Sequence, residues 1–394
     1  MEQTNPTRRK RRSVYQRSRR EQGVLLACLL LVTVLVFNIV SLLTPDRSYS
    51  EQENRKLASA PRLSWAGLTE GTWFSDVESY VADQFAARDF WIALQLRFAR
   101  FMGAKESNGV LLCKDDYLME APAEPDQEAL ERNLAAVNAF AATHSDVNVV
   151  MSVVPNAASV LAEKLPKNVP VRDQLQDIRG IADSLQGVTF VDVTETLAAH
   201  KSEDIYYRTD HHWTTLGASY AFADLAPALG LNASGMQYTV YPVSTTFEGT
   251  LASRSGCHVV RDTVELWVPQ TDIEYYVTYE DSAETTCSLY DPEALNQKDH
   301  YTVFFGGNHP RVDVTTTAET GKCLLIFKDS YANCLVQFLT PYYENIVIID
   351  PRYYYGDIGT LMKREGVTDV LFLYNANTFL GDTSLADLLS TETE

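Results

Sequence analysis

The segment RTDHHWT at residues 208–214 brings carboxylate, imidazole and indole side chains together in a pattern that fits neither a helical core nor a strand core. In an extended chain Asp210 and His212 point to the same face, because side chains alternate along it. A carboxylate so placed can fix the tautomer of an imidazole and stabilise its protonated form. A helix-like stretch, residues 215–229, comes next, so we expect a loop that leads into a helix.

A serine at the end of an apolar run marks the second segment. Residues 323–327 (CLLIF) predict a buried strand, Ser330 comes soon after it, and a helix is expected from about Tyr331. Open α/β sheets place ligands at the carboxyl ends of their strands. The N–H groups at the start of a helix can also stabilise an oxyanion there. This strand–turn–serine–helix order follows the logic of a nucleophile elbow without its glycines.

Each segment alone has a plain structural explanation. Asp329 or Ser330 could cap the helix, and Asp210 and His212 could form a structural hydrogen bond. Together, however, the two segments supply a nucleophile, a base and an orienting acid, the set that acyl transfer needs. No metal is expected on Asp210, His211 and His212, because no Glu or Cys is spaced to complete the ligand set. The sequence calls for no cofactor.

An alternation of apolar runs and helical segments must position these groups. Near-continuous apolar strands between helices indicate one mainly parallel sheet covered on both faces, hence an α/β fold with flanking helices. Residues 237–316, rich in Thr, Val and Tyr, predict a β-rich insertion. The expected strands are residues 147–154, 189–193, 323–327, 346–349 and 368–374, and the expected helices are residues 126–143, 171–185 and 358–365, together with the helix after Ser330.

Smaller features complete this outline. Residues 70–103 have the apolar spacing of a helical pair packed on the main domain. Residues 110–112 and 117–118 predict a short hairpin. The cysteines lack metal-type spacing, and Cys323 is expected to be a buried thiol. Whether Cys257 and Cys287 form a disulfide stays open.

A charge-free run of 21 residues, 24–44, is long enough to span a membrane as a helix. Residues 1–23 hold eight basic and two acidic side chains, and such clusters collect on the cytoplasmic side. A cleaved signal peptide is the alternative, but the run is long and no small-x-small cleavage site follows it. We expect a basic cytoplasmic tail at 1–23, a signal anchor at 24–44, a linker at 45–69 and an extracytoplasmic domain at 70–394.

The rest of the chain is strongly acidic. Beyond residue 23 it holds 25 basic and 50 acidic side chains. Because the phosphate backbone repels such a surface, we expect no nucleic acid partner.

Four segments carry a family resemblance: ENRKLASAP (53–61), YYRTDHHWTTLGA (206–218), KDSYANCLVQFL (328–339) and IDPRYY (349–354). They resemble the DHHW-motif family of bacterial envelope proteins, which is similar to the alginate O-acetyltransferase-like branch of the SGNH hydrolase superfamily. The resemblance covers most of residues 50–380. It implies an SGNH-hydrolase-like α/β fold and extracytoplasmic O-acyl transfer or removal on a carbohydrate.

The resemblance also implies roles for single residues. In the related acetyltransferases a TD-x-H-W motif supplies Asp and His, and a later Ser is the nucleophile; here these are Asp210, His212 and Ser330. The superfamily usually has Gly-Asp-Ser at the nucleophile, whereas this chain has Lys328 before Asp329 and Ser330.

Three further residues are candidates for oxyanion or substrate binding. Asn308 and Asn333 carry amides that could bind an oxyanion, with turn and helix-surface roles as alternatives. Arg352 could bind a substrate anion or pair with Asp350. None of the three follows from a superfamily motif that this chain retains.

Our hypothesis is a membrane-anchored, extracytoplasmic Ser-His-Asp protein that acetylates or deacetylates a cell-envelope glycan. A transferase would also need a multispan acyl-donor membrane protein, because a single span cannot carry acyl groups across a membrane. The rival hypothesis is a catalytically inactive envelope protein of the same fold that binds carbohydrate or assists assembly. The two differ in geometry: the enzyme requires His212 within about 2.6–3.2 Å of the Ser330 hydroxyl.

Overall fold

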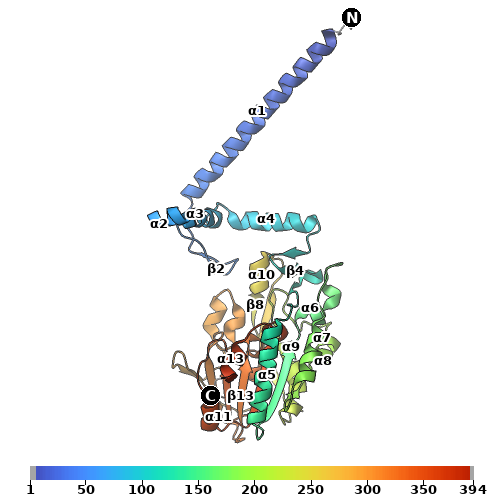
Figure 1. Ribbon diagram of the computed structural model, residues 1–394, viewed down its shortest axis with the longest axis vertical. Helices are drawn as coiled ribbons and strands as arrows, with labels where there is room; N and C mark the ends of the chain where they lie inside the picture. The colour runs from blue at the N-terminus through green and yellow to red at the C-terminus, as the bar shows by residue number, and fades with distance from the viewer. Residues whose placement is uncertain (1–5, 391–394) are drawn as a thin grey trace. The chain divides into compact units, whose positions relative to one another are not determined.

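The computed structural model describes residues 6–390, with side chains from residue 19 onward (Figure 1). The chain forms two compact units that divide between Gln95 and Leu96. Of the expected basic tail, residues 1–5 and the side chains of residues 6–18 lie outside the described part.

One long helix, α1 (Pro6–Leu43), begins the first unit. Its stretch Arg19–Leu43 is long and apolar enough to cross a membrane, which suits a signal anchor or a signal peptide. The expected helical pair is present as α3 (Thr72–Asp83) and α4 (Arg88–Phe101), and α4 continues past Gln95. The elements after α1 are β1 (Tyr49–Ser50), β2 (Arg55–Lys56), α2 (Trp65–Glu70), α3 (Thr72–Asp83) and α4 (Arg88–Phe101).

An eight-stranded sheet in the order β11-β10-β12-β14-β13-β15-β6-β7 forms the centre of the second unit. All five expected strands lie in it, and β14, β13, β15, β6 and β7 run parallel to one another. This confirms the α/β fold. The five strands are β6 (Asn148–Val154), β7 (Thr189–Phe190), β13 (Cys323–Lys328), β14 (Asn345–Ile349) and β15 (Asp369–Asn375). β7 is shorter than expected, because Asp192 accepts a hydrogen bond from the N–H of Thr194 and helix α8 (Thr194–Ala199) begins there.

The β-rich region divides between two sheets. Strands β10 (Tyr275–Tyr279), β11 (Thr285–Thr286) and β12 (Arg311–Thr316) extend the central sheet as an antiparallel edge. Strands β8 (Tyr238–Phe247) and β9 (Asp262–Pro269) form a separate antiparallel pair. Part of the expected insertion is therefore continuous with the core.

Helices cover both faces of the central sheet, as the apolar strands require. Alternate residues of β13 pack to opposite sides: Leu324 and Ile326 lie in the core with helix α9, and Leu325 and Phe327 lie in the core with α5, α7, α11 and α13. The helices of this unit are α5 (Gln127–Thr143), α6 (Ala157–Val160), α7 (Gln174–Ser184), α8 (Thr194–Ala199), α9 (Thr215–Ala228), α10 (Thr250–Ser255), α11 (Ile358–Glu365), α12 (Ala376–Phe379) and α13 (Ser384–Ser390).

Local features mostly follow expectation. The hairpin is present as β4 (Val110–Leu112) paired with β5 (Leu118–Glu120), and β3 (Glu106–Ser107) adds a third strand. Cys323 is buried, and Cys257 (buried) and Cys287 (exposed) are both free thiols. One expectation is wrong: Ser330–Ala332 is a 3₁₀ turn followed by a second one at Val336–Phe338, and no α-helix forms there.

Candidate active site

The DHHW sequence lies in a tight loop closed at its base. Tyr206 and Trp213 form an antiparallel bridge, and the N–H of Tyr207 donates to the carbonyl of His212 (3.2 Å). Helix α9 begins directly afterwards, with Thr214 as its N-cap. The residues between the bridged pair are thereby held at one end of the helix, as the sequence predicted.

Asp262, at the start of β9, fixes the tip of this loop. Its carboxylate accepts hydrogen bonds from the N–H of Arg208 (3.0 Å) and from both the N–H (2.8 Å) and the hydroxyl (2.6 Å) of Thr209. The Thr209 hydroxyl accepts in turn from the N–H of Gly249 (2.9 Å). The backbone before Asp210 therefore has a fixed course.

Asp210, His212 and Ser330 meet in one chain of hydrogen bonds. The Nδ1 atom of His212 lies 2.6 Å from Oδ1 of Asp210, and its Nε2 atom lies 2.7 Å from Oγ of Ser330. Asp210 and His212 are buried, whereas Ser330 is half-buried. The fold thus brings the acid, the imidazole and the hydroxyl into the order that the triad hypothesis requires.

Four hydrogen bonds satisfy the carboxylate of Asp210. Oδ1 accepts from the N–H and Nδ1 of His212, and Oδ2 accepts from the N–H (2.8 Å) and the hydroxyl (2.9 Å) of Thr250. Burial opposes ionisation of Asp210, but the charges of His211 and His212 and these hydrogen bonds outweigh it and lower its pKa. Asp210 is therefore an anion that can only accept hydrogen bonds.

An anionic Asp210 determines the tautomer of His212. Nδ1 must carry the proton that it donates to Asp210, so Nε2 keeps a lone pair that can accept from the Ser330 hydroxyl. Burial, helped by the positive charge of His211, lowers the pKa of His212 to about 4 against the pull of Asp210. The imidazole is thus neutral near pH 7, as a general base must be.

Ser330 is positioned by the residue before it. Oδ1 of Asp329 accepts from the N–H of Tyr331 (2.9 Å), and Oδ2 accepts from the N–H of Asn375 (2.8 Å) at the end of β15. Asp329, one of the two cap candidates, thus caps the 3₁₀ turn that replaces the expected helix, and it joins the carboxyl ends of the neighbouring strands β13 and β15. The turn that presents Ser330 rests on the centre of the sheet.

Two tyrosines and a tryptophan also position the site. The ring of Tyr301 stacks on that of His212, with centroids 3.9 Å apart and planes 12° apart. Trp213 donates from Nε1 to the carbonyl of Tyr331 (2.9 Å), and the Tyr331 hydroxyl donates to the carbonyl of His211. The DHHW loop and the Ser330 turn are therefore joined directly.

The two candidate amides lie beside one another. Nδ2 of Asn333 donates to Oδ1 of Asn308 (3.3 Å), and Nζ of Lys328 donates to the same oxygen (3.0 Å). Asn333 is buried and Asn308 is exposed. Because its oxygen faces two donors, the amide group of Asn308 has one preferred orientation, with Nδ2 directed away from them.

Arg352, the third candidate, forms a two-pronged ion pair with Asp350, with Nε–Oδ1 and Nη2–Oδ2 distances of 2.8 and 2.6 Å. Lys328 also contacts Asp350, at 3.4 Å. The Lys328 side chain is buried, and burial lowers its pKa. At the position of the superfamily's glycine, this chain therefore turns a lysine inward to a carboxylate and an amide.

Donor atoms of Asp210, His211 and His212 lie within 4.8 Å of one another, close enough to share a metal ion. However, Asp210 and His212 use these atoms within the triad, and Nδ1 of His211 lies 2.9 Å from the Thr250 hydroxyl. Binding an ion through these atoms would break the hydrogen bonds that orient the base.

The chain is similar to proteins of known structure. A DHHW family protein from Eubacterium siraeum is 26% identical, with a TM-score of 0.62 over 73% of this chain and 96% of that one. PatB1 from Bacillus cereus, solved with a sulfonyl adduct, is 18% identical, with a TM-score of 0.57 over 70% of this chain and 97% of that one, which shows a shared fold. The curated protein sequences give no match.

The family model of the SGNH hydrolase-like domain of the acetyltransferase AlgX matches residues 109–297. The matched part contains Asp210 and His212 and ends before Ser330. The structural similarity to the E. siraeum protein extends over more of the chain. The resemblance is thereby confirmed: the chain is similar to a DHHW family protein, and residues 109–297 match the model of an SGNH hydrolase-like domain.

Proposed function

We propose that this protein is a Ser-His-Asp acyl-transfer enzyme in which Ser330 is the nucleophile, His212 the general base and Asp210 the residue that orients it. The observation that carries the proposal is the contact of 2.7 Å between His212 Nε2 and Ser330 Oγ. The rival hypothesis, an inactive binding protein, gains no comparable support, because nothing in such a role requires a half-buried hydroxyl on a neutral, oriented imidazole.

The chemistry follows from these three groups. Oγ of Ser330 forms a bond to the carbonyl carbon of an acyl donor while its proton moves to Nε2 of His212, and the carbonyl electrons move to the oxygen. When the tetrahedral intermediate collapses, the leaving oxygen takes the proton from His212 and an acyl-serine remains. An acceptor hydroxyl then gives its proton to His212 and attacks the acyl carbon. When this second intermediate collapses, the bond to Oγ breaks and Oγ of Ser330 takes the proton back from His212.

The oxyanion needs donors that are in place before it forms. We assign this role to the backbone N–H of Ser330 and to Nδ2 of Asn308, because the N–H groups of Tyr331, Ala332 and Asn333 donate within the turn. The inward-facing Lys328 and Asn333 support the second assignment, because both hold the oxygen of Asn308. Arg352 we assign to holding Asp350 in place.

The acceptor separates two enzymes with the same site. A sugar hydroxyl would make the protein an O-acetyltransferase, and water would make it a carbohydrate esterase. The matched family model describes an acetyltransferase domain, and on that basis we propose a cell-envelope glycan as substrate and favour transfer. A transferase would draw its acyl groups from a multispan membrane partner.

We also propose that residues 24–44 are an uncleaved signal anchor with residues 1–23 in the cytoplasm, and that residues 45–69 link it to an extracytoplasmic domain at 70–394. The apolar stretch of α1 supports an anchor. A reporter enzyme fused after residue 60 should be active only outside the cytoplasm. Activity in the cytoplasm would reverse the orientation.

The activity test uses the full chain in detergent with p-nitrophenyl acetate, alone and with an envelope glycan as acceptor. Ser330→Ala should remove turnover, lowering kcat about 1,000-fold or more. Ser184→Ala, which changes an exposed serine on α7, should retain it. Acetate release alone would indicate an esterase, and acetylated glycan a transferase. Full activity of Ser330→Ala would exclude the covalent mechanism.

A further inference from the structure

Helices α3 and α4 of the first unit carry a continuous row of exposed apolar side chains. We call this surface the α3–α4 apolar face. Between 37% and 60% of each residue is exposed, and aromatic rings predominate. Exposed apolar patches of this kind mark interaction sites. The face consists of Phe74, Val81, Phe85, Phe90, Trp91 and Leu94.

The apolar residues of α4 follow a helical repeat. Phe90, Leu94, Phe98 and Phe101 are spaced four, four and three positions apart, which places them on one side of the helix. Arg88, Asp89 and Arg100 lie away from this side, whereas Arg97 borders it. The helix is therefore amphipathic, most clearly in the turns before Arg97.

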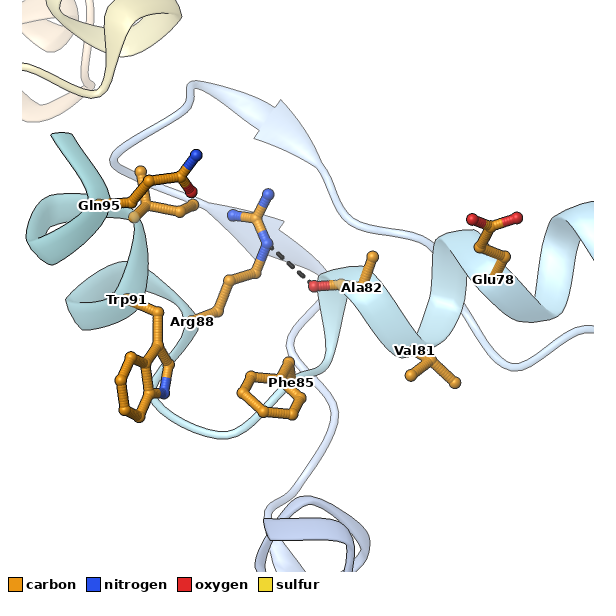
Figure 2. Close-up of a pocket in the computed structure, with 8 residues that line it drawn as sticks. Glu78, Val81, Ala82, Phe85, Arg88, Trp91 and Gln95 are labelled. Atoms are coloured by element: carbon orange, nitrogen blue, oxygen red, sulfur yellow. Dashed lines mark hydrogen bonds between the residues drawn. The ribbon is translucent and has the colours of Figure 1, made fainter. Parts of the chain in front are cut away.

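A hollow of about 550 Å³ at the junction of α3 and α4 likewise has an apolar side and a polar side. Figure 2 shows Val81, Phe85 and Trp91 pointing to one side of it, whereas Glu78 and Arg88 point to the other. The guanidinium of Arg88 is paired with Glu53 at 2.6 and 2.9 Å. The apolar side is thus left without charge, and the polar side is held by ion pairs.

The junction contacts the apolar end of α1. The ring of Phe37 stacks on that of Phe85, with centroids 5.8 Å apart, and meets that of Trp91 edge to face at 5.5 Å. The N–H of Ala86 donates to the hydroxyl of Ser41 (3.1 Å). Phe37 lies about 9 Å along the helix axis from the end of α1 at 1.5 Å per residue, well inside its apolar stretch.

The contact between the junction and α1 indicates which partner covers the α3–α4 apolar face. If α1 spans a bilayer, then a junction packed on Phe37 lies within the same lipid layer, and its apolar side faces acyl chains. The segment after α1 also contacts the polar side of both helices. Arg47 pairs with Asp89 of α4 (2.8 Å), and Asp46 accepts a hydrogen bond from Tyr80 of α3 (2.9 Å), so this polar side is held toward the membrane surface. Aromatic residues are typical of this interface.

We propose that α3 and α4 lie in the interface of the bilayer that α1 spans, with the α3–α4 apolar face inserted at the boundary of headgroups and acyl chains. The occupant is lipid of the same leaflet, and neutral phosphatidylcholine suffices because the face carries no charge. The inference rests on the membrane anchor proposed above.

The test places the full chain in phosphatidylcholine vesicles, with or without lipid brominated near the headgroup end of its chains. Flotation with the vesicles first checks that α1 anchors the protein. A failure of the anchor is thereby distinguished from a failure of the α3–α4 proposal. The part of the tryptophan emission that Trp91→Phe removes should be lost in brominated lipid. The part that Trp267→Phe removes, from strand β9 of the second unit, should be retained.

Two tryptophan substitutions, each made in the Trp91→Phe variant, test which side of α3 contacts lipid. Val81→Trp should introduce emission that brominated lipid quenches, whereas Asp76→Trp, on the opposite side of α3, should introduce emission that it does not quench. A floating protein whose Trp91 and Val81→Trp emission is insensitive to brominated lipid would overturn the proposal. That outcome would point to a protein partner or a second copy on the face.

Discussion

The side chain of Tyr301 touches both ends of the reacting pair. Its ring stacks on His212 at 3.9 Å, and its hydroxyl donates to the backbone carbonyl of Ser330 at 2.9 Å. The residue is buried and comes from a 3₁₀ turn between β11 and β12. It therefore holds the imidazole and the nucleophile in position relative to each other from within the core.

Tyr301→Phe should keep the stacked ring and lose the hydrogen bond. Because such a bond contributes about 1 kcal/mol, we expect kcat to fall roughly five- to tenfold with KM nearly unchanged. Tyr301→Leu removes the aromatic ring as well and should lower kcat further. Steady-state kinetics of both variants check this, and equal rates for Phe and Leu would show that the stacking does not matter.

Asp210→Asn tests the tautomer. The N–H and hydroxyl of Thr250 both donate to Oδ2, so the asparagine oxygen should turn toward them and its NH₂ toward His212. Nδ1 would then have to accept, which moves the imidazole proton to Nε2, where it faces Ser330.

We expect Asp210→Asn to lower kcat about 100- to 1,000-fold, less than Ser330→Ala, because the nucleophile is still present. Asp183→Asn on the surface of α7 is the control. Nitrogen NMR of the imidazole reports the tautomer directly. A wild-type tautomer in Asp210→Asn would contradict this account.

The sequence predicted the three triad residues, but it did not predict the residues that hold them in position. Asp210, His212 and Ser330 carry recognisable motifs, and the apolar strands before and between them identify the sheet. Thr250, Asp262 and Tyr301 lie in segments without a motif, and only the tertiary fold brings them to the DHHW loop. The local sequence pattern after Ser330 also gave a wrong prediction, because two short 3₁₀ turns replace the expected helix.

Gly249 allows the backbone before α10 to approach Asp210. A Cβ atom there would lie 2.4 Å from both Cβ and Oδ2 of Asp210, which is too close for any rotamer to relieve without moving the carboxylate. Gly249→Ala should therefore lower kcat by at least about tenfold and destabilise the fold by roughly 1–3 kcal/mol. Thermal unfolding and turnover measure the two effects.

Gly180→Ala is the matched control for that substitution. Gly180 lies on the exposed surface of α7 with no atom near the position of its Cβ. The change should leave kcat unaltered and stabilise the helix by about 1 kcal/mol. A tolerated Gly249→Ala would mean that Asp210 does not need its present position.

The pH profile tests the state of His212. Only the neutral imidazole can take a proton from Ser330, and the pKa of His212 is lowered to about 4 by burial and by the charge of His211. Therefore kcat/KM should stay constant from neutral pH downward and fall by half only near pH 4, whereas an ordinary histidine would produce this fall near pH 6.5. His211→Asn removes the neighbouring charge and should move the fall to higher pH. His200→Asn, at a half-buried histidine paired with Glu203, should not.

One other group could produce a fall at intermediate pH. Burial raises the pKa of Asp299 to about 6, helped by the negative charge of Asp210. If protonation of Asp299 disturbs the site, activity would instead fall near pH 6, and Asp299→Asn would abolish that fall. A midpoint near pH 6.5 that persists in Asp299→Asn and does not move in His211→Asn would mean that His212 titrates as an exposed imidazole, and the buried, oriented base would have to be abandoned.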